Sequence, residues 1–535
     1  MQFLLLLTLV AATPVDEISP SDPRLQYVGR WDRSDSNSPW CAWQGSSLRF
    51  RFRGESCSAI LTNTGEEEYI RILIDGEALP ESKIPLQPGR RRYRLCSNLQ
   101  PGVHEVEIVK ETYLGKGRMH CNAIQIPAGR ILSPPPPKQL RIAFYGDSNL
   151  AGYSLENERN DSAKQYRGCH FTFAGIVARM LDADYQNISS SGATLAGQPN
   201  SGLTFFDRMD FHSVVPRWDF DRFPADICVI NLGANDISSK SKLEIKRDYR
   251  VLLDRIRQAH PNAHIVLMNA YGWSRQEPAN YTDEVVTEMA DCDLSRLTFP
   301  WFFNEWHGCE YDHGGMAHTL AAHLATINPA WKTSHKSDVF DGFSRGGDVA
   351  NGSFEQVAPF GGFGWRYRDN GITRVHDPVQ SPDGKWYLRL SAKGATHQPI
   401  PASPGQTFTA QLDLRGEIAS QAELRLEFRD QEWRHQIPSL ERRIPIKVDT
   451  EWKTVHLRIQ VPKLGQADDS HQPWQMIFHI SANDVPIHVD KIQFRRQLNA
   501  CRPTGRRQNC YQNEADRTGL LLHRRQDATA LTPPH

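Results

Sequence analysis

Hydrophobic and polar residues alternate with different periods along the chain, and the change of period divides it into three segments. Between residues 24 and 132, short runs such as SLRFRFRG, CSAILTN and HEVEIVKE are separated by Gly, Asn and Asp. Regular short strands without a helical stretch are typical of a β-sandwich. We therefore predict an N-terminal β-sandwich that ends at the polyproline spacer SPPPPKQ, residues 133–139.

The second segment, residues 140–337, alternates strand-like with helix-like text. The runs RIAFYG and ADICVINLG are almost continuously apolar, whereas KLEIKRDYRVLLDRIRQAH and GGMAHTLAAHLATI have helical periodicity. Apolar strands that alternate with helices indicate a parallel sheet covered on both faces. We predict a central α/β domain here.

The third segment, residues 338–497, returns to strand-like runs such as WYLRLSA and AELRLEFRD, without a helix of any length between them. This pattern predicts a second β-sandwich. The polar, basic remainder, residues 498–535, is expected to be a loosely ordered tail. The predicted fold class is thus multidomain, with an α/β domain between two β-sandwiches.

Composition limits the ligands and the cellular location that we expect for the protein. Lys+Arg and Asp+Glu number 62 each in the 535 residues, so no overall charge would attract nucleic acid or an anionic membrane. Residues 1–12, MQFLLLLTLVAA, resemble a cleaved signal peptide and are too short to span a bilayer. We expect a secreted, extracellular protein, in which the ten cysteines are candidates for disulfides. No cysteine or histidine spacing typical of a zinc site occurs, so we expect neither a metal nor a cofactor.

Candidate chemistry follows the ends of the central strands. The run RIAFYG leads directly into Asp-Ser-Asn, which places Ser148 as a nucleophile at the end of a buried strand. Gly192 and Asn235 follow two further strands, and the carboxyl ends of parallel strands share one crevice. We expect an oxyanion hole formed by the backbone N–H groups of Ser148 and Gly192 and by the Asn235 amide.

A serine nucleophile needs a base, and the sequence CEYDHGGMAH offers one just before the last helix. We predict that His313 takes the Ser148 proton, with Glu310 as the orienting acid and Asp312 as the second choice. His307 is an alternative base in the preceding loop. A Ser–His pair without an acid is also open.

Taken in order, GDSN, the Gly192 position, GANDIS and the acid/His stretch resemble the four blocks of the SGNH, or GDSL-like, hydrolases. The earlier segments WQGSSLRF, LIDGE and HEVEIVKET resemble the N-terminal jelly-roll of carbohydrate esterase family 2, whose members remove acetyl groups from plant cell-wall polysaccharides. The resemblance covers about residues 24–337. It implies a serine esterase acting on an acetylated carbohydrate. The last block departs from the usual Asp-x-x-His-Pro, because Glu310 and Gly314 replace its Asp and Pro.

Other residues have two interpretations. Trp301 and Trp306 would either stack on a sugar ring or pack their own loop. His318 and His323 are expected to be ordinary helical residues. The third segment, with NGSFEQ and WRYRDNG, resembles appended carbohydrate-binding modules.

Two other functions compete with acetyl esterase activity. The same scaffold would serve a lipase-like or other short-chain acyl hydrolase. A non-catalytic glycan-binding protein would have lost at least one of Ser148, Asn235 and His313, and all three are present.

Overall fold

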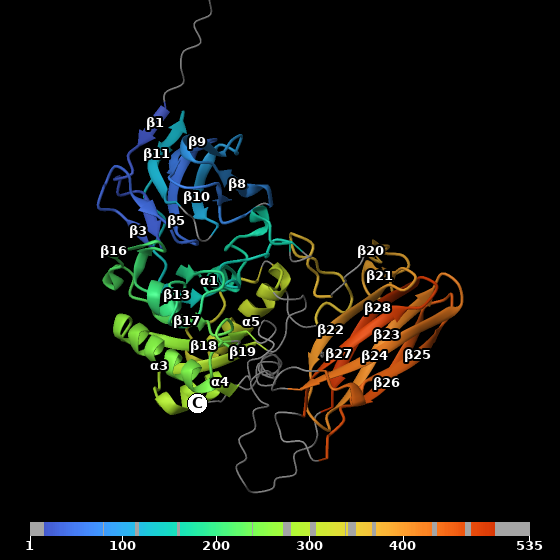
Figure 1. Ribbon diagram of the computed structural model, residues 1–535. Coiled ribbons are helices and arrows are strands. Elements are labelled where there is room, and N and C mark those ends of the chain that lie inside the picture. Colours follow the sequence, from blue (N-terminus) through green and yellow to red (C-terminus); the bar gives the residue numbers. More distant parts are fainter. Residues whose placement is uncertain are drawn as a thin grey trace, which may run out of the picture.

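The computed structural model describes residues 15–78, 80–112, 117–157, 161–237, 239–270, 280–299, 307–337, 339–340, 349–365, 371–430, 436–465 and 472–497. The predicted signal peptide and tail lie outside the described residues. The predicted fold class is confirmed: a parallel α/β domain lies between two antiparallel β-sandwiches (Figure 1). Among the described helices, none is long and apolar enough to cross a lipid bilayer.

The N-terminal domain is a sandwich of two antiparallel sheets. One has the order β3-β4-β11-β6-β9 with β1 beside β11, and the other has the order β12-β5-β10-β7-β8 with β2 beside β5. Alternate residues of these strands, such as Phe50, Phe52 and Ile72, fill the core between the sheets. The strands are β1 (Val15–Ile18), β2 (Gln26–Val28), β3 (Trp31–Asp32), β4 (Trp40–Cys41), β5 (Ser47–Gly54), β6 (Cys57–Asn63), β7 (Glu68–Ile74), β8 (Lys83–Leu86), β9 (Gly89–Cys96), β10 (Gly102–Lys110), β11 (Met119–Pro127) and β12 (Arg130–Ile131).

The central domain is built on a parallel sheet of order β14-β13-β17-β18-β19. Side chains of β13 alternate between its faces: Ile142 and Phe144 join the core formed with α1 and α5, whereas Ala143 and Tyr145 join the core formed with α3. Both faces are therefore buried, which explains the continuous apolar runs. The main elements are β13 (Leu140–Gly146), α1 (Phe173–Met180), β14 (Ala183–Ser189), β17 (Ile227–Asn231), α3 (Lys242–Ala259), β18 (His264–Ala270), α4 (Asn280–Met289), β19 (Leu294–Phe299) and α5 (Glu310–Ile327).

Shorter elements lie between these. They are α2 (Gly202–Phe205), the antiparallel pair β15 (Arg208–Asp210) and β16 (Ser213–Arg217), and the 3-10 helices η2 (Lys164–Tyr166) and η3 (Phe220–Arg222). The sandwiches contain η1 (Pro80–Ser82) and η4 (Pro438–Leu440).

Helix α5 begins four residues earlier than its periodicity suggests, and this changes the interpretation of the site. The Asp312 carboxylate accepts the backbone N–H of Cys309 at 2.9 Å and caps the first turn. Residues Glu310–Gly314 are therefore wound into the helix and do not form a loop.

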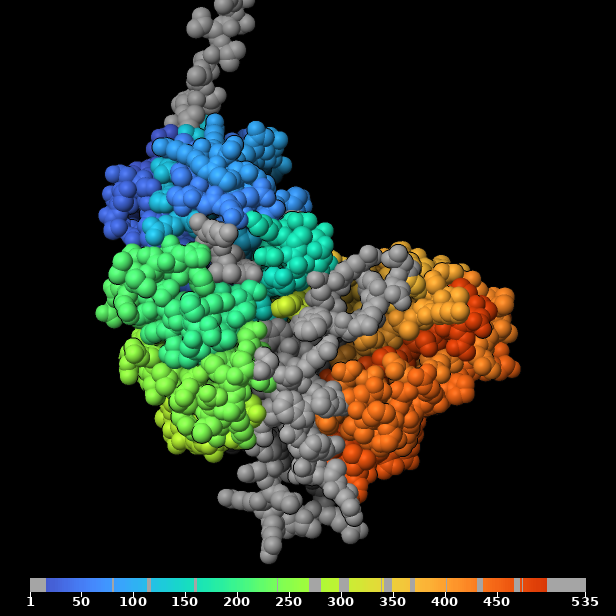
Figure 2. All heavy atoms as spheres, viewed as in Figure 1, coloured from blue at the N-terminus to red at the C-terminus, as the bar shows by residue number. Residues whose placement is uncertain are grey.

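The C-terminal domain is also a sandwich, with sheet orders β20-β21-β28-β23-β26 and β22-β27-β24-β25. Residues 349–365 connect it to the central domain, because Ala350 and Ala358 belong to the central core while Phe354 and Trp365 belong to the sandwich core. Figure 2 shows the N-terminal domain in blue above the central domain in green, with the C-terminal domain in orange to the right. The strands are β20 (Ile372–His376), β21 (Trp386–Leu390), β22 (Ala395–Pro401), β23 (Thr407–Gly416), β24 (Ser420–Asp430), β25 (Arg442–Val448), β26 (Lys453–Gln460), β27 (Pro473–Ala482) and β28 (Ile487–Arg496).

Candidate active site

Ser148 lies two residues beyond the end of β13, the second strand of the sheet, at the sheet's carboxyl edge. Gly146 is in register with Ser189 of β14 on one side and with Asn231 of β17 on the other. The loops that follow β14 and β17 carry Gly192 and Asn235, so both flank the Ser148 turn. The structure thus brings together the strand-end residues that the sequence singled out.

The turn that carries Ser148 is tight and held by its own backbone. The Tyr153 N–H donates to the Ser148 carbonyl at 3.0 Å, and the Ala151 N–H donates to the Asp147 carbonyl at 2.9 Å. A Cβ on Gly146 would lie 2.8 Å from the Cβ of Leu150, so a larger residue would push the turn away from the strand.

The side of the site that is predicted to bind the oxyanion combines a glycine turn with an amide side chain. Gly192 has φ +74°, a conformation that favours glycine. The Asn235 amide nitrogen donates to the Ala193 carbonyl at 2.9 Å, which places it at this turn. Within the described parts of the chain, the backbone N–H groups of Ser148 and Gly192 donate no hydrogen bond. Both are therefore available to a developing oxyanion.

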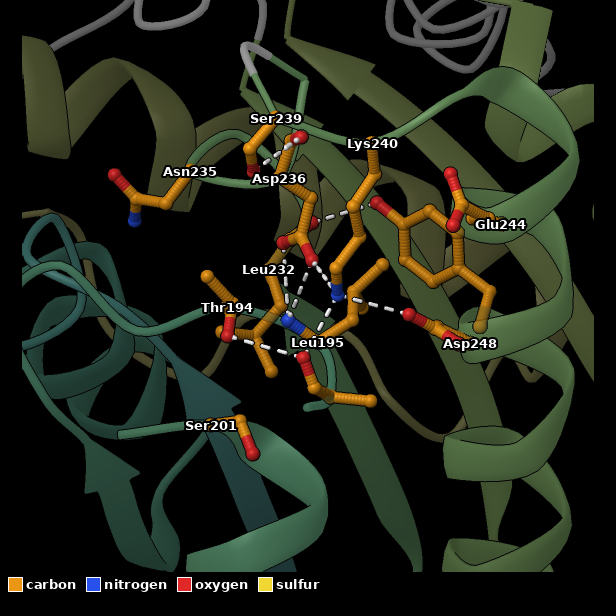
Figure 3. Close-up of polar contacts among 12 residues, drawn as sticks. Thr194, Leu195, Ser201, Leu232, Asn235, Asp236, Ser239, Lys240, Glu244 and Asp248 are labelled. Carbon is orange, nitrogen blue, oxygen red and sulfur yellow. Dashed lines mark hydrogen bonds and ion pairs between the residues drawn. The ribbon is translucent and has the colours of Figure 1, made fainter. Parts of the chain in front are cut away.

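Asp236 joins the two flanking loops, and Figure 3 shows its carboxylate on the opposite side of the backbone from Asn235. It accepts the Leu195 N–H at 2.9 Å and the Lys240 ammonium at 2.6 Å. Lys240 also donates to Asp248 of α3 at 2.8 Å. Burial raises the pKa of Asp236, although the bonds from Lys240 and Leu195 oppose that shift. This network fixes the Gly192 and Asn235 loops to each other and to a helix.

The structure places His307 against Ser148. Its Nε2 atom lies 2.9 Å from the Ser148 Oγ, and its ring centroid lies 4.8 Å from that of Tyr153. Burial lowers the pKa of His307 to about 4, so the ring is neutral at pH 7. A neutral imidazole is the form that accepts a proton from a serine hydroxyl.

The prediction that placed His313 at Ser148 is corrected by these contacts. His313 lies in the first turn of α5, where its Nδ1 accepts the Phe173 N–H at 3.1 Å and its ring stacks on Phe173. Burial lowers the pKa of His313 to about 3. The sequence analysis gave His307 only as the alternative base, because Glu310 stands three residues before His313 whereas Asn304, which is not an acid, stands three residues before His307. Its position in the loop ahead of the last helix was the remaining signal.

The predicted orienting acids also have other partners. The Glu310 carboxylate accepts the Phe360 N–H at 2.7 Å, on the segment that leads to the C-terminal sandwich. Burial raises the pKa of Glu310 to about 7. Asp312 caps α5 through Cys309. These contacts are to backbone groups and correct the predicted pairing of Glu310 or Asp312 with His313.

The other sequence candidates lie elsewhere. His318 packs near Phe340, and His323 Nε2 lies 3.0 Å from the Ser295 Oγ, near the start of β19 and thus at the opposite end of the sheet. Trp301 and Trp306, the predicted sugar-stacking residues, lie outside the described residues.

Within the part of the chain that the structure describes, one cluster has the geometry to approach a metal ion, formed by Asp291, Cys292 and Asp293 before β19. Arg257 already binds Asp291 at 2.8 Å. This cluster precedes the start of β19 and so lies at the end of the parallel sheet opposite Ser148.

Comparison with known families agrees with this geometry. Residues 27–136 match the family model Carbohydrate esterase 2 N-terminal, and residues 144–295 match the GDSL-like Lipase/Acylhydrolase family. Two consecutive stretches of the chain are therefore similar to a carbohydrate esterase N-terminal domain and to a GDSL-like hydrolase domain, and the resemblance drawn from its motifs is confirmed. At the level of these two family matches, the prediction of a carboxylic ester hydrolase is confirmed as well.

Individual relatives are similar to slightly more than half of the chain. The cellulase/esterase CelE of Acetivibrio thermocellus is 29% identical over 326 residues, which cover 57% of this chain and 39% of CelE. The acetylxylan esterase / glucomannan deacetylase of Cellvibrio japonicus is 24% identical over 58% of this chain and 90% of its own length. The structure of a family two carbohydrate esterase from Clostridium thermocellum in complex with cellohexaose is 27% identical, with a TM-score of 0.53 over 57% of this chain and 99% of that one.

Proposed function

We propose that the protein is an esterase that removes O-acetyl groups from an acetylated carbohydrate, with Ser148 as nucleophile and His307 as base. The observation that carries this proposal is the 2.9 Å contact between His307 Nε2 and Ser148 Oγ. It lies in a GDSL-like domain preceded by a carbohydrate esterase N-terminal domain.

In the proposed mechanism, His307 takes the hydroxyl proton while Ser148 Oγ attacks the acetyl carbonyl carbon. The tetrahedral oxyanion accepts hydrogen bonds from the Ser148 and Gly192 N–H groups and the Asn235 amide. His307 then returns the proton to the departing sugar hydroxyl, which leaves acetyl-Ser148. A water molecule, deprotonated by His307, attacks the carbonyl carbon of this ester, and His307 returns the proton to Ser148 Oγ as the ester bond breaks and acetate leaves.

The proposed substrate class is acetylated hemicellulose. The name of the Cellvibrio relative supports xylan or glucomannan as its backbone. The GDSL-like motifs do not define the acyl chain of the substrate. The N-terminal sandwich, which matches a carbohydrate esterase model, therefore supports a sugar ester over the competing lipase-like substrate.

Acetate release from acetylated xylan and acetylated glucomannan, compared with hydrolysis of short- and long-chain nitrophenyl esters, tests this function. We expect acetate from at least one polysaccharide and no hydrolysis of the long-chain ester. Hydrolysis of the long-chain ester alone would favour a lipase-like enzyme, and no hydrolysis by a folded protein would favour a glycan-binding protein.

We also propose that the chain is exported and that Cys57 and Cys96 form a disulfide. The two residues are register partners on β6 and β9, and their Sγ atoms lie 3.4 Å apart. Oxidation by a thiol–disulfide oxidant would remove one hydrogen from each thiol and form the S–S bond. The closed loop would stabilise the folded state by roughly 3–4 kcal/mol. Peptide mass mapping without reductant should show the Cys57–Cys96 link. Two free thiols in protein recovered from the culture medium would contradict it.

A further inference from the structure

We propose that the N-terminal sandwich, called the jelly-roll domain below, positions the catalytic pair of Ser148 and His307. It does so through Lys83 and Arg71, which hold Glu156 in the segment that follows Ser148. This inference rests on the proposed roles of Ser148 and His307. It assigns the N-terminal domain a part in turnover and not only in substrate binding.

Lys83 of β8 is the first link, and it uses all of its donors across the domain boundary. Its ammonium donates to Glu156 Oε2 at 2.8 Å and to the carbonyls of Gln165 and Arg167 at 2.7 Å each. An ammonium has three N–H donors, so this site satisfies it fully. One jelly-roll side chain therefore binds two stretches of the segment between Ser148 and α1, one at residue 156 and one at residues 165–167.

Arg71 of β7 binds the same carboxylate from the other side. Its guanidinium donates to Glu156 Oε1 and, at 2.9 Å, to Glu111 Oε1. Glu111 in turn accepts the His170 N–H at 3.1 Å. Arg71 and Glu111 are fully buried, and loss of one partner from such a cluster leaves an uncompensated charge.

Two glycines let the stretches around residues 152 and 168 of this segment lie against each other. Gly152 has φ +72°, and a Cβ there would lie 1.7 Å from the Gly168 carbonyl oxygen. A Cβ on Gly168 would lie 2.7 Å from Glu111 Oε1 and 2.9 Å from Glu156 Oε1. The path of the backbone at Gly168 therefore depends on where the two carboxylates lie. Arg71 and Lys83 of the jelly-roll domain set the positions of these carboxylates.

Tyr153 transmits this position to the catalytic pair. Its N–H binds the Ser148 carbonyl at 3.0 Å, and its ring lies 4.8 Å from that of His307. The Arg167 guanidinium lies 4.7 Å from the Tyr153 ring, while Lys83 binds the Arg167 carbonyl. Contacts therefore run without a break from Lys83 to His307, and a shift of about 1 Å at a reacting group can lower turnover about 100-fold.

A second buried ion pair between the domains provides the matched control. Arg49 of β5 binds Asp184 at 2.7 Å. Asp184 lies at the start of β14, at the end of the sheet opposite Ser148. Loss of this pair weakens domain docking and leaves the Ser148 segment untouched. The exposed pair of Lys164 with Glu66 serves as a second control.

The test measures kcat and KM for 4-nitrophenyl acetate, together with Tm, for the full chain and for Lys83→Met, Glu156→Gln, Arg49→Met and Lys164→Met. We expect Lys83→Met and Glu156→Gln to lower kcat roughly 10- to 100-fold with KM within about twofold of wild type. Arg49→Met should lower Tm and keep kcat within about twofold, and Lys164→Met should change neither. Lys83→Arg, which keeps the charge, should recover part of kcat.

An active wild type with unchanged kcat in Lys83→Met would overturn the positioning role and leave the proposed function standing. Equal kcat losses in Lys83→Met and Arg49→Met would overturn it too, because general docking would then explain both. A folded wild type without esterase activity would instead overturn the proposed function, and with it the roles on which this inference rests.

Discussion

At the scale of single residues, burial decides what His307 can do. A histidine in water is half protonated near pH 6.5, and a protonated ring cannot accept the Ser148 proton. Burial lowers the pKa of His307 to about 4, so the base is already neutral in mildly acidic solution. The same ring contacts Ser148 on one side and Tyr153 on another.

The pH dependence of hydrolysis follows from this shift. Because the active form is the neutral ring, kcat/KM should stay high as pH falls and decline only near the lowered pKa of His307, which is about 4. Tyr153→Ala, which opens the ring to water, should move the acid limb up toward pH 6.5. Initial rates of wild type and Tyr153→Ala from about pH 3 to pH 8 locate the acid limb of each protein. A wild-type limb at or above pH 6.5 would contradict a buried neutral base.

Sequence alone located the residues that follow a strand end, but it ranked His307, which no strand end positions, below His313. Ser148, Gly192 and Asn235 each follow a recognisable buried strand, so their convergence could be deduced from parallel topology. No periodicity positions His307, and the acid-to-histidine spacing pointed to His313. That spacing belongs to the capped first turn of α5, where Asp312 binds the Cys309 N–H.

At the scale of elements, the loops after β14 and β17 work as one unit because Asp236 and Lys240 join them. The elements with strong periodicity were predictable: the run read as a helix over 242–260 is α3, Lys242–Ala259. Helix α4 and the β15–β16 pair were not, because NYTDEVVTEM has only 10 residues and SVVPR only 5, and elements this short depend on tertiary contacts.

Removal of the Lys240 ammonium tests this unit. Lys240→Met leaves the Asp236 and Asp248 carboxylates without their shared cation, so the Asn235 and Gly192 loops should loosen. We expect kcat to fall roughly tenfold with little change in KM, which is less than complete loss of an oxyanion donor causes. Lys246→Met, which breaks ion pairs of α3 with Glu284 and Glu288, is the control. Equal kinetics for the two variants would show that the oxyanion loops do not need Lys240.

At the scale of the whole molecule, the two sandwiches are packed onto the hydrolase domain by buried groups. Lys83 and Arg71 join the first sandwich to the Ser148 segment. Glu310 and the Phe171–Phe360 ring contact fix the segment that leads to the second. The three-segment layout was predictable from periodicity. These contacts were not, because they join residues far apart in the chain. Carbohydrate binding by the second sandwich stays a prediction.

Glu310 makes stability depend on pH in a defined direction. Burial raises its pKa from 4.5 to about 7, so the unfolded chain loses this proton at a lower pH than the folded chain. Its contribution to stability is therefore lost as pH rises from 4.5 through 7, by about 3 kcal/mol at most. Denaturant titrations of wild type and Glu310→Gln at pH 5 and pH 8 measure the difference. Between these pH values, wild type should lose stability relative to the variant, and parallel behaviour would refute the assignment.

The central claim is that His307, rather than His313, is the base for Ser148. Its most direct test compares kcat/KM for 4-nitrophenyl acetate in His307→Gln and His313→Gln, with Ser148→Ala as the inactive reference and Tm as the check of folding. The account predicts a loss of roughly 1,000-fold or more for His307→Gln, close to that of Ser148→Ala, and at most about tenfold for folded His313→Gln, whose amide can still accept the Phe173 N–H. A severe loss in His313→Gln with near wild-type activity in His307→Gln would contradict it.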